Sequence, residues 1–317
     1  MSMRPVSLLA DIGGTNARFA LCGEAGKLRD AGSLRVADFP TFEDALEAYL
    51  AGIDGAKRAM VTRAFVAAAG PVGADGNIDL TNSRWRISQG TISKYIGGEA
   101  MVLNDVEAIA LELPYIRLDG CRAIGATLPP PQTGNRLAVN VGTGFGASIA
   151  VRDRDGSWSA VATEAGHMCY APQTENERRL GGHIATIEDL LSGAGISRAH
   201  RLLRENLAGT GSVPPPIALT ASDVFAAAGS QPAATAAVLA FSDALARATS
   251  DLVLATGSWG GAYLAGSVVK TWADHSDHRR FREVFVGHGK MADRLRDVPT
   301  SVVTLPEPAL LGLSRLV

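Results

Sequence analysis

The sequence of 317 residues has few cysteines, and none of them is arranged to bind a metal. Its three cysteines, Cys22, Cys121 and Cys169, lie far apart, and no Cys-x-x-Cys or Cys/His ligand spacing occurs. An odd number of scattered thiols argues against a disulfide framework and is typical of a reducing compartment. We therefore expect reduced, mostly buried thiols in a cytoplasmic protein.

An excess of one charge, a targeting segment and a membrane span are missing as well. The 30 basic and 32 acidic residues give a net charge of −2, so no nucleic-acid or membrane-surface partner is expected. The N-terminal MSMRPVSLLADIGG has one arginine and too short an apolar run for a signal peptide. The long apolar stretch Ala233–Thr256 carries Asp243, Arg247 and Asp251 four residues apart. This stripe of charge predicts a core helix with one wet edge.

The phosphate-binding motif G-x-x-x-x-G-K-[ST] is absent, but another glycine turn stands near the N-terminus. Leu8 to Leu21, LLADIGGTNARFAL, reads as strand, turn and strand, with Asp11 where the first strand runs into the turn. Gly13 and Gly14 let the backbone approach a ligand, and Thr15 and Asn16 add donors. The pattern suits a phosphate tail; the alternative is an ordinary hairpin whose glycines serve only the turn.

A second segment repeats this pattern. Leu137 to Val151, LAVNVGTGFGASIAV, aligns Asn140 with Asp11 and predicts another hairpin. Two such hairpins indicate two related domains that face each other across a nucleotide. The string from Gly142 to Ala147 also satisfies G-x-G-x-x-A, but a strand pattern follows where the dinucleotide-binding motif requires a helix, so we disfavour that interpretation.

The remaining pattern is that of a mixed α/β protein. We expect a helix over Thr41–Leu50 capped by Thr41, a buried strand over Ala64–Ala69, and a short strand over Ala100–Leu103 followed by a helix over Val106–Leu113. A late strand over Ser301–Leu305 and a C-terminal helix end the chain. Strands and helices in this order predict mixed sheets flanked by helices.

Asn104 and Asp105 follow the short strand and precede its helix. Both residues are good helix caps, which is the simpler interpretation. The functional interpretation is a base, because an aspartate near a helix N-terminus stays ionised and can accept a proton from an alcohol.

A further set of polar residues occurs in the middle of the chain. Glu164-x-x-His167 allows three interpretations. It is half of a di-iron pattern, although the second copy is missing; it is a structural ion pair; or it is a polyol-binding pair that Glu188 could join. His275-x-x-His278 is expected in a solvated loop and not at a metal.

Several collinear segments resemble the bacterial glucokinase family, sugar kinases of the actin-like ATPase superfamily, and the resemblance covers nearly the whole chain. The segments are LLADIGGTNARFAL, AGPV (Ala69–Val72) with LTNSRW (Leu80–Trp85), LNDVEAIA (Leu103–Ala110), VGTGFGAS (Val141–Ser148), TEAGHMCYAP (Thr163–Pro172), EDLLSGAGI (Glu188–Ile196), AYLAGSVV (Ala262–Val269) and PALLG (Pro308–Gly312).

The resemblance implies two ribonuclease-H-like domains with mixed five-stranded sheets and an active-site cleft between them. The small domain would comprise residues 1–107 and 306–317, and the large domain residues 108–305. It also implies a hexose kinase that uses ATP and Mg²⁺, with a homodimer as the family's usual assembly.

The same resemblance implies a role for each matching residue. Asp105 would be the catalytic base, and the sugar would be bound by Asn82, Asn104, Asp105, Glu164, His167 and Glu188. Phosphates and adenine would be held by Asp11, Ile12, Gly13, Gly14, Thr15, Asn16, Gly142, Thr143, Gly144 and Gly266. Mg²⁺ would be bound through ATP, with no direct protein ligand and at most a contact from Asp11 through water.

Two positions depart from the family pattern. Ala165 stands where a glycine usually lies beside the sugar, and Ser267 replaces a usual glycine in the adenine-side turn. A kinase for another hexose or an amino sugar therefore stays an alternative to a glucokinase. A sugar-binding regulator without catalysis is a further alternative, which the intact Asp105, Gly13, Gly14 and Thr143 disfavour.

Overall fold

The computed structural model describes residues 5–23, 26–80, 83–125, 133–208, 219–287 and 289–317. It forms two compact units, one of Met1–Ile116, Trp158–Ala162 and Leu305–Val317, and one of Arg117–Ser157 and Thr163–Thr304. The boundary expected between residues 107 and 108 lies inside helix α4 (Asp105–Glu112), and the first unit contains this helix whole.

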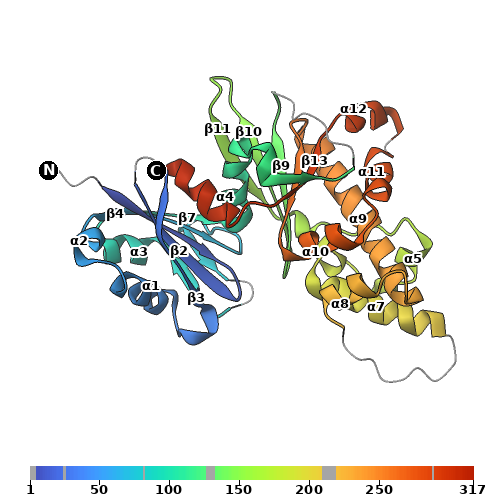
Figure 1. Ribbon diagram of the computed structural model, residues 1–317, viewed down its shortest axis with the longest axis horizontal. Helices are drawn as coiled ribbons and strands as arrows, with labels where there is room; N and C mark the ends of the chain where they lie inside the picture. The colour runs from blue at the N-terminus through green and yellow to red at the C-terminus, as the bar shows by residue number, and fades with distance from the viewer. Residues whose placement is uncertain (1–4, 24–25, 81–82, 126–132, 209–218, 288) are drawn as a thin grey trace. The chain divides into compact units, whose positions relative to one another are not determined.

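Each of the two large sheets combines antiparallel and parallel strands (Figure 1). The first sheet has the order β3-β2-β1-β4-β7, and the second has the order β11-β10-β9-β12-β13-β8. The second sheet has one strand more than expected, because the short β8 pairs antiparallel with β13 at its edge. The strands are β1 (Val6–Ile12), β2 (Asn16–Gly23), β3 (Leu28–Arg35), β4 (Val61–Ala68), β5 (Asn77–Asp79), β6 (Arg86–Ser88), β7 (Glu99–Asn104), β8 (Cys121–Ala123), β9 (Arg136–Val141), β10 (Phe145–Arg152), β11 (Trp158–Thr163), β12 (Ala262–Ala265) and β13 (Thr300–Val303).

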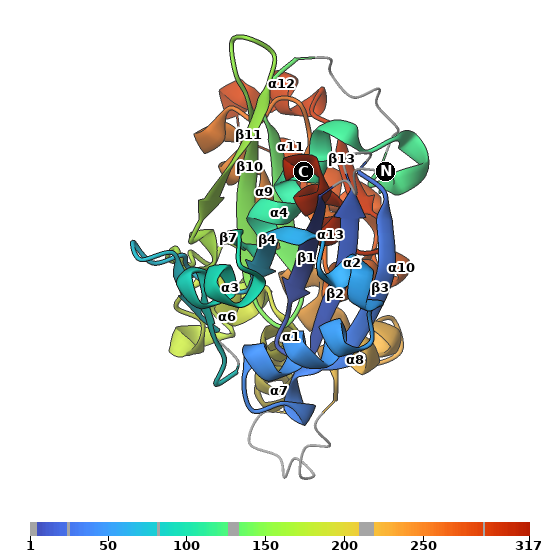
Figure 2. The same ribbon diagram turned by 90° about the vertical axis from the view of Figure 1, so that its left-hand side faces the viewer.

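Helices cover both faces of the first sheet (Figures 1 and 2). Alternate residues of β1, such as Leu8, Ala10 and Ile12, enter the core under α1 and α3. The intervening residues, among them Leu9 and Asp11, face the other side, where α13 packs on β1 and β4. The helices of this unit are α1 (Phe42–Ala51), α2 (Gly55–Arg58), α3 (Gln89–Ile96), α4 and α13 (Pro308–Leu313).

Local capping explains the helices that the sequence predicted in this unit. Thr41 and Asp44 form the capping box that starts α1. Asn104 caps α4, so Asp105 is the first residue of the helix and not a residue before it. The short helices α2 and α3 were not expected, because α2 buries no side chain and α3 buries only Ile92, which leaves no apolar period to recognise.

The core of the second unit lies between its sheet and a layer of helices. It contains one face of β9, β10 and β12 and the apolar side chains of α7, α9, α10 and α11. Among the described residues no single helix is long and apolar enough to cross a membrane; α8 and α9 meet that criterion only together, and the chain bends by 110° between them. The helices are α5 (Glu175–Arg178), α6 (Ile187–Leu190), α7 (Gly193–Ala208), α8 (Ala221–Ala227), α9 (Pro232–Thr256), α10 (Ser267–His275), α11 (His278–Val286) and α12 (Ala292–Arg296).

Candidate active site

The first glycine turn connects β1 to β2, as the sequence predicted. The strands pair antiparallel up to Ile12 and Ala17, and the Gly13 N–H donates to the carbonyl of Asn16 over 3.0 Å. Asn16 already belongs to β2, so the turn itself consists of Gly13, Gly14 and Thr15. A tight turn of this kind can bring backbone N–H groups close to an anion.

A line of three charged side chains begins at this turn. Asp11 lies directly opposite Arg18 in the β1–β2 register, and Arg18 Nη1 is 3.3 Å from Asp11 Oδ2. On the other side, Arg18 Nε lies 3.7 Å from Oε1 of Glu307, the residue before α13. Burial raises the pKa of the Asp11 carboxyl above its ordinary value, and the Arg18 guanidinium opposes that rise. Arg18 therefore compensates a charge that the hairpin would otherwise carry alone.

Asp105 begins α4 at the carboxyl end of β7, and it is half-buried. Its Oδ1 accepts the Val106 N–H over 2.9 Å, a bond that favours the ionised carboxylate. Asn104 Oδ1 accepts from Val106 and Glu107, while Asn104 Nδ2 donates to the Gly70 carbonyl over 3.0 Å. Capping and ligand binding are thus compatible, since these bonds leave one amide N–H of Asn104 for a ligand.

The second glycine turn connects β9 to β10 in the same way. Val141 pairs with Phe145, and the Gly142 N–H donates to the Gly144 carbonyl over 3.0 Å. A strand and not a helix follows Gly144, which rules out the dinucleotide-binding interpretation of this string. The pattern of strand, turn and strand is therefore correct for both segments.

Glu188 on α6 lies against this second turn. Its Oε2 accepts the Phe145 N–H over 2.7 Å, and a Cβ at Gly144 would overlap the carboxylate. The sequence suggested only that Glu188 could join a set of sugar ligands. The contact shows a second reason for Gly144, which is to leave room for a carboxylate from a distant helix.

Two further segments contact the second turn and the end of β9. The Gly193 N–H, at the start of α7, donates to the Gly142 carbonyl over 2.9 Å. Gly266 joins β12 to α10 with φ +99°, and a Cβ there would collide with the Val141 carbonyl. Only glycine fits such a position. The tertiary structure thus brings Gly266 against Val141 and Asn140 at the end of β9, just before the second turn.

Glu164 and His167 lie at the end of β11 and around the short 3-10 helix of Ala165–His167. Their side chains are more than half exposed, and His167 Nε2 is 3.9 Å from Glu164 Oε2. Ala165 is 3% exposed and its methyl belongs to the core of the second unit. The core has room for a methyl group at residue 165. It has none at residue 166, where a Cβ would overlap the Phe145 carbonyl.

Asn82, the remaining expected sugar ligand, lies outside the described residues. Arg18 and Glu307 join the candidate site through Asp11, and the sequence did not predict either of them. The register could have indicated Arg18, because a hairpin closed by Ile12 and Ala17 must place residues 11 and 18 opposite each other. Nothing in the sequence links Glu307 to residue 18.

No group of three or more potential metal ligands occurs among the described residues. His275 ends α10 and His278 begins α11, so the two histidines lie in helices and not in the expected loop, although His275 is exposed. Nδ1 of His275 lies 2.9 Å from the Thr271 carbonyl, and Nε2 of His278 lies 2.8 Å from the Ala273 carbonyl. The Asp11 carboxylate is an oxygen donor of the kind that Mg²⁺ prefers. A single carboxylate suits an ion bound chiefly by phosphate oxygens and water.

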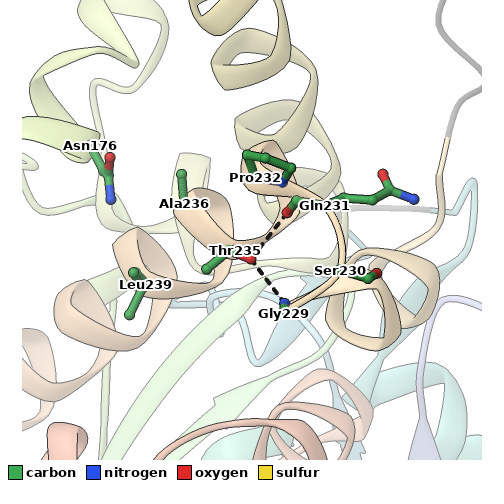
Figure 3. A pocket seen from close by; sticks show the side chains of 8 residues that line it. All are labelled: Asn176, Gly229, Ser230, Gln231, Pro232, Thr235, Ala236 and Leu239. Atoms are coloured by element: carbon green, nitrogen blue, oxygen red, sulfur yellow. Dashed lines mark hydrogen bonds between the residues drawn. The ribbon is translucent and has the colours of Figure 1, made fainter.

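A pocket of about 390 Å³ lies at the start of α9, and none of the predicted site residues lines it (Figure 3). Some of its polar groups hydrogen-bond to one another: the Thr235 hydroxyl accepts the Gly229 N–H and donates to the Gln231 carbonyl. The full lining is Asn176, Gly229, Ser230, Gln231, Pro232, Thr235, Ala236 and Leu239.

Comparison with known proteins agrees with the motifs. Residues 8–317 match the Glucokinase family. The chain is 33% identical to a glucokinase of Paramagnetospirillum magneticum, covering 99% of this chain and 98% of the relative, and 36% identical to a glucokinase of Caulobacter vibrioides, covering 97% and 93%. A crystal structure of glucokinase from an Antarctic psychrotroph is similar with a TM-score of 0.80 and 28% identity over 99% of both chains.

Proposed function

The chain belongs to the glucokinase family, and on this premise we propose that it transfers the γ-phosphoryl group of ATP to the 6-hydroxyl of glucose with Asp105 as the general base. The observation that carries this assignment of the base is the half-buried Asp105 carboxylate at the first residue of α4. A hydrogen bond from the Val106 N–H and the helix N-terminus favour its ionised form, which is the form that accepts a proton.

The reaction requires that one hydroxyl be deprotonated as it attacks phosphorus. Asp105 takes the proton of the 6-hydroxyl while the sugar oxygen forms its bond to the γ-phosphorus and the bond to the ADP oxygen breaks. Asn104 orients the sugar with its remaining amide N–H. Glu164, His167 and Glu188 accept or donate hydrogen bonds to the other hydroxyls, and Asn82 is proposed for the same role.

The two glycine turns would hold the phosphates. Backbone N–H groups of Gly14 and Thr15, and of Thr143 and Gly144, suit the oxygens of a triphosphate. Gly13 and Gly142 close the two turns through their own N–H groups and so present these donors. Ile12 and Asn16 flank the first turn, and Gly266 belongs to the adenine side. Mg²⁺, when bound, neutralises phosphate charge, and Asp11 would contact its water shell.

The burial of Ala165 supports glucose, and not another hexose, as the substrate. The methyl that distinguishes this chain from the family pattern lies in the core and not on an exposed surface, so it need not alter the sugar site. ADP release measured with glucose, mannose, fructose and amino sugars tests the substrate. A higher kcat/KM for any sugar other than glucose would contradict the proposal.

The substitution Asp105→Asn tests the base. We expect kcat to fall by about 10²- to 10⁴-fold, because that is the usual contribution of a general base. The melting temperature should stay close to that of the wild type, since asparagine has nearly the same shape and its Oδ1 can still accept the Val106 N–H, while Asn104 keeps its role as the cap. Asp119→Asn, at an exposed carboxylate without a proposed role, is the matched control and should leave kcat unchanged. A turnover near that of the wild type in Asp105→Asn would remove Asp105 from this role.

A further inference from the structure

The helix that carries Asp105 is short and is held at its far end by an ion pair. α4 has eight residues, so Glu112 at its C-terminus lies about 10 Å along the axis from Asp105. The Glu112 side chain is 5% exposed. A buried carboxylate at a helix C-terminus is doubly unfavourable, because it is desolvated and lies at the negative end of the helix dipole.

Arg315, in the short 3-10 helix after α13, compensates this charge. Its Nε is 2.8 Å from Glu112 Oε2 and its Nη2 is 3.0 Å from Glu112 Oε1, a bidentate geometry that fixes direction as well as distance. The guanidinium also lies over the Tyr115 ring, 4.2 Å from its centroid. The planar guanidinium therefore holds the end of α4 in one orientation.

A second contact joins the two helices backbone to backbone. A Cβ at Gly312 of α13 would overlap the carbonyl oxygen of Ala108, which lies within one turn of Asp105. Only glycine permits so close an approach. At its other end α13 starts after Glu307, whose carboxylate meets the Arg18 that pairs with Asp11. α13 thus contacts both the helix of Asp105 and the charged line at the first glycine turn.

Stability alone does not account for this arrangement. A buried ion pair commonly contributes little to stability compared with apolar side chains of similar volume, while its geometry can specify a single packing. We propose that α13 is a positioning element of the phosphoryl-transfer site: Arg315, through Glu112, and Gly312, through Ala108, set the axial position and rotation of α4 and with them the position of the Asp105 carboxylate. This inference rests on the proposed role of Asp105 as base.

The decisive variant replaces both charges, Glu112→Met with Arg315→Met. Removing the pair leaves no buried charge without a partner, so the melting temperature should be equal to or above that of the wild type. kcat should nevertheless fall by roughly tenfold to a hundredfold, because a small displacement of a catalytic group is costly. The KM for ATP should stay within about twofold, since this pair makes no part of the proposed phosphate site.

A matched pair in the second unit provides the control. Asp243, whose side chain is 3% exposed, accepts bidentate bonds of 2.9 and 2.8 Å from Arg280, and neither residue has a proposed role in the site. Asp243→Leu with Arg280→Met should change the melting temperature only and leave kcat within about twofold of the wild type.

The inference would be overturned if the Glu112/Arg315 double variant melts at or above the wild-type temperature and its kcat is normal. Should that variant not fold, Arg315→Lys decides, because it keeps the charge and loses the bidentate geometry. A severalfold fall in kcat at a nearly unchanged melting temperature supports positioning, and an unchanged kcat overturns it. Asp105→Asn, measured beside these variants, separates the two proposals: normal turnover there removes the proposed base, whereas loss there with a normal kcat in the double variant removes only the role of α13.

Discussion

The penultimate residue of β1 is Asp11, and the penultimate residue of β9 is Asn140. Both strands continue for one more residue, turn through glycines and return antiparallel. Opposite Asp11 stands Arg18, whereas opposite Asn140 stands Gly146. The first hairpin therefore carries its own pair of charges, and the second is neutral at the same place.

The second hairpin obtains its charge from elsewhere. The Glu188 carboxylate reaches Phe145 N–H from α6 and occupies the space that a side chain at residue 144 would need. The same strand–turn–strand backbone thus occurs with two arrangements of charge. In the first unit the carboxylate lies on strand β1, and in the second unit it lies on helix α6. The repeated backbone is consistent with the phosphate-binding role proposed for both turns, while the side chains around each turn differ in charge.

The variant Asp11→Asn makes the first hairpin like the second and should have the largest effect among the hairpin variants. We expect kcat to fall by about a hundredfold, because the proposed contact of Asp11 with the water shell of Mg²⁺ is lost. Stability at neutral pH should rise, because burial raises the pKa of Asp11 and the ionised form therefore costs stability in the folded state. Arg18 keeps Glu307 as a partner, so no buried charge is left alone.

The sign of this effect depends on pH. Below the ordinary pKa of about 3.8 the carboxyl is neutral in both the folded and unfolded states, and the variant and the wild type should be equally stable in this respect. The advantage of Asp11→Asn should grow as the pH rises through the higher pKa of the folded state and then stay constant. Denaturant unfolding at several pH values measures it, with Asn140→Asp as the reciprocal variant, which should lose stability because no cation stands opposite. A stability difference that shrinks as the pH rises would contradict this account.

Gly144→Ala compared with Gly13→Ala tests the crowding at the two turns. The Cβ at residue 144 would displace Glu188 and leave the Phe145 N–H without its acceptor, which costs about 1–3 kcal/mol. At residue 13 the nearest atom is the Asn16 carbonyl oxygen at 3.6 Å, an ordinary contact, so stability should change by less than about 1 kcal/mol. Thermal unfolding measures both, and the KM for glucose should rise in Gly144→Ala. Equal destabilisation at the two turns would show that Glu188 does not distinguish them.

Ala165→Gly should have the smallest effect on the reaction. Removing the buried methyl and adding backbone freedom should cost about 1 kcal/mol of stability. The KM for glucose should stay within about twofold, because the methyl packs in the core. Glu188→Gln, measured in parallel, should raise the KM for glucose several-fold. A large change of sugar preference in Ala165→Gly would instead place the methyl at the sugar.

Local patterns predicted much of the fold. Both glycine hairpins, the capped helix after Thr41 and the helix after Asn104 follow from short stretches of sequence, because turns and caps are decided by neighbours within a few residues. The short α3 and the edge strand β8 escaped prediction, since three to eight residues with little apolar period give no clear signal.

Consecutive residues specify the two turns and the carboxylate that begins α4, because strand alternation, glycines and a helix cap are local features. The distant groups that contact them depend on tertiary packing: Arg18 and Glu307 at the first turn, Glu188 and Gly266 at the second, and Arg315 at the C-terminal end of α4. These contacts join residues separated by up to 289 positions, as between Arg18 and Glu307. Their geometry depends on how whole elements pack, which no local pattern records.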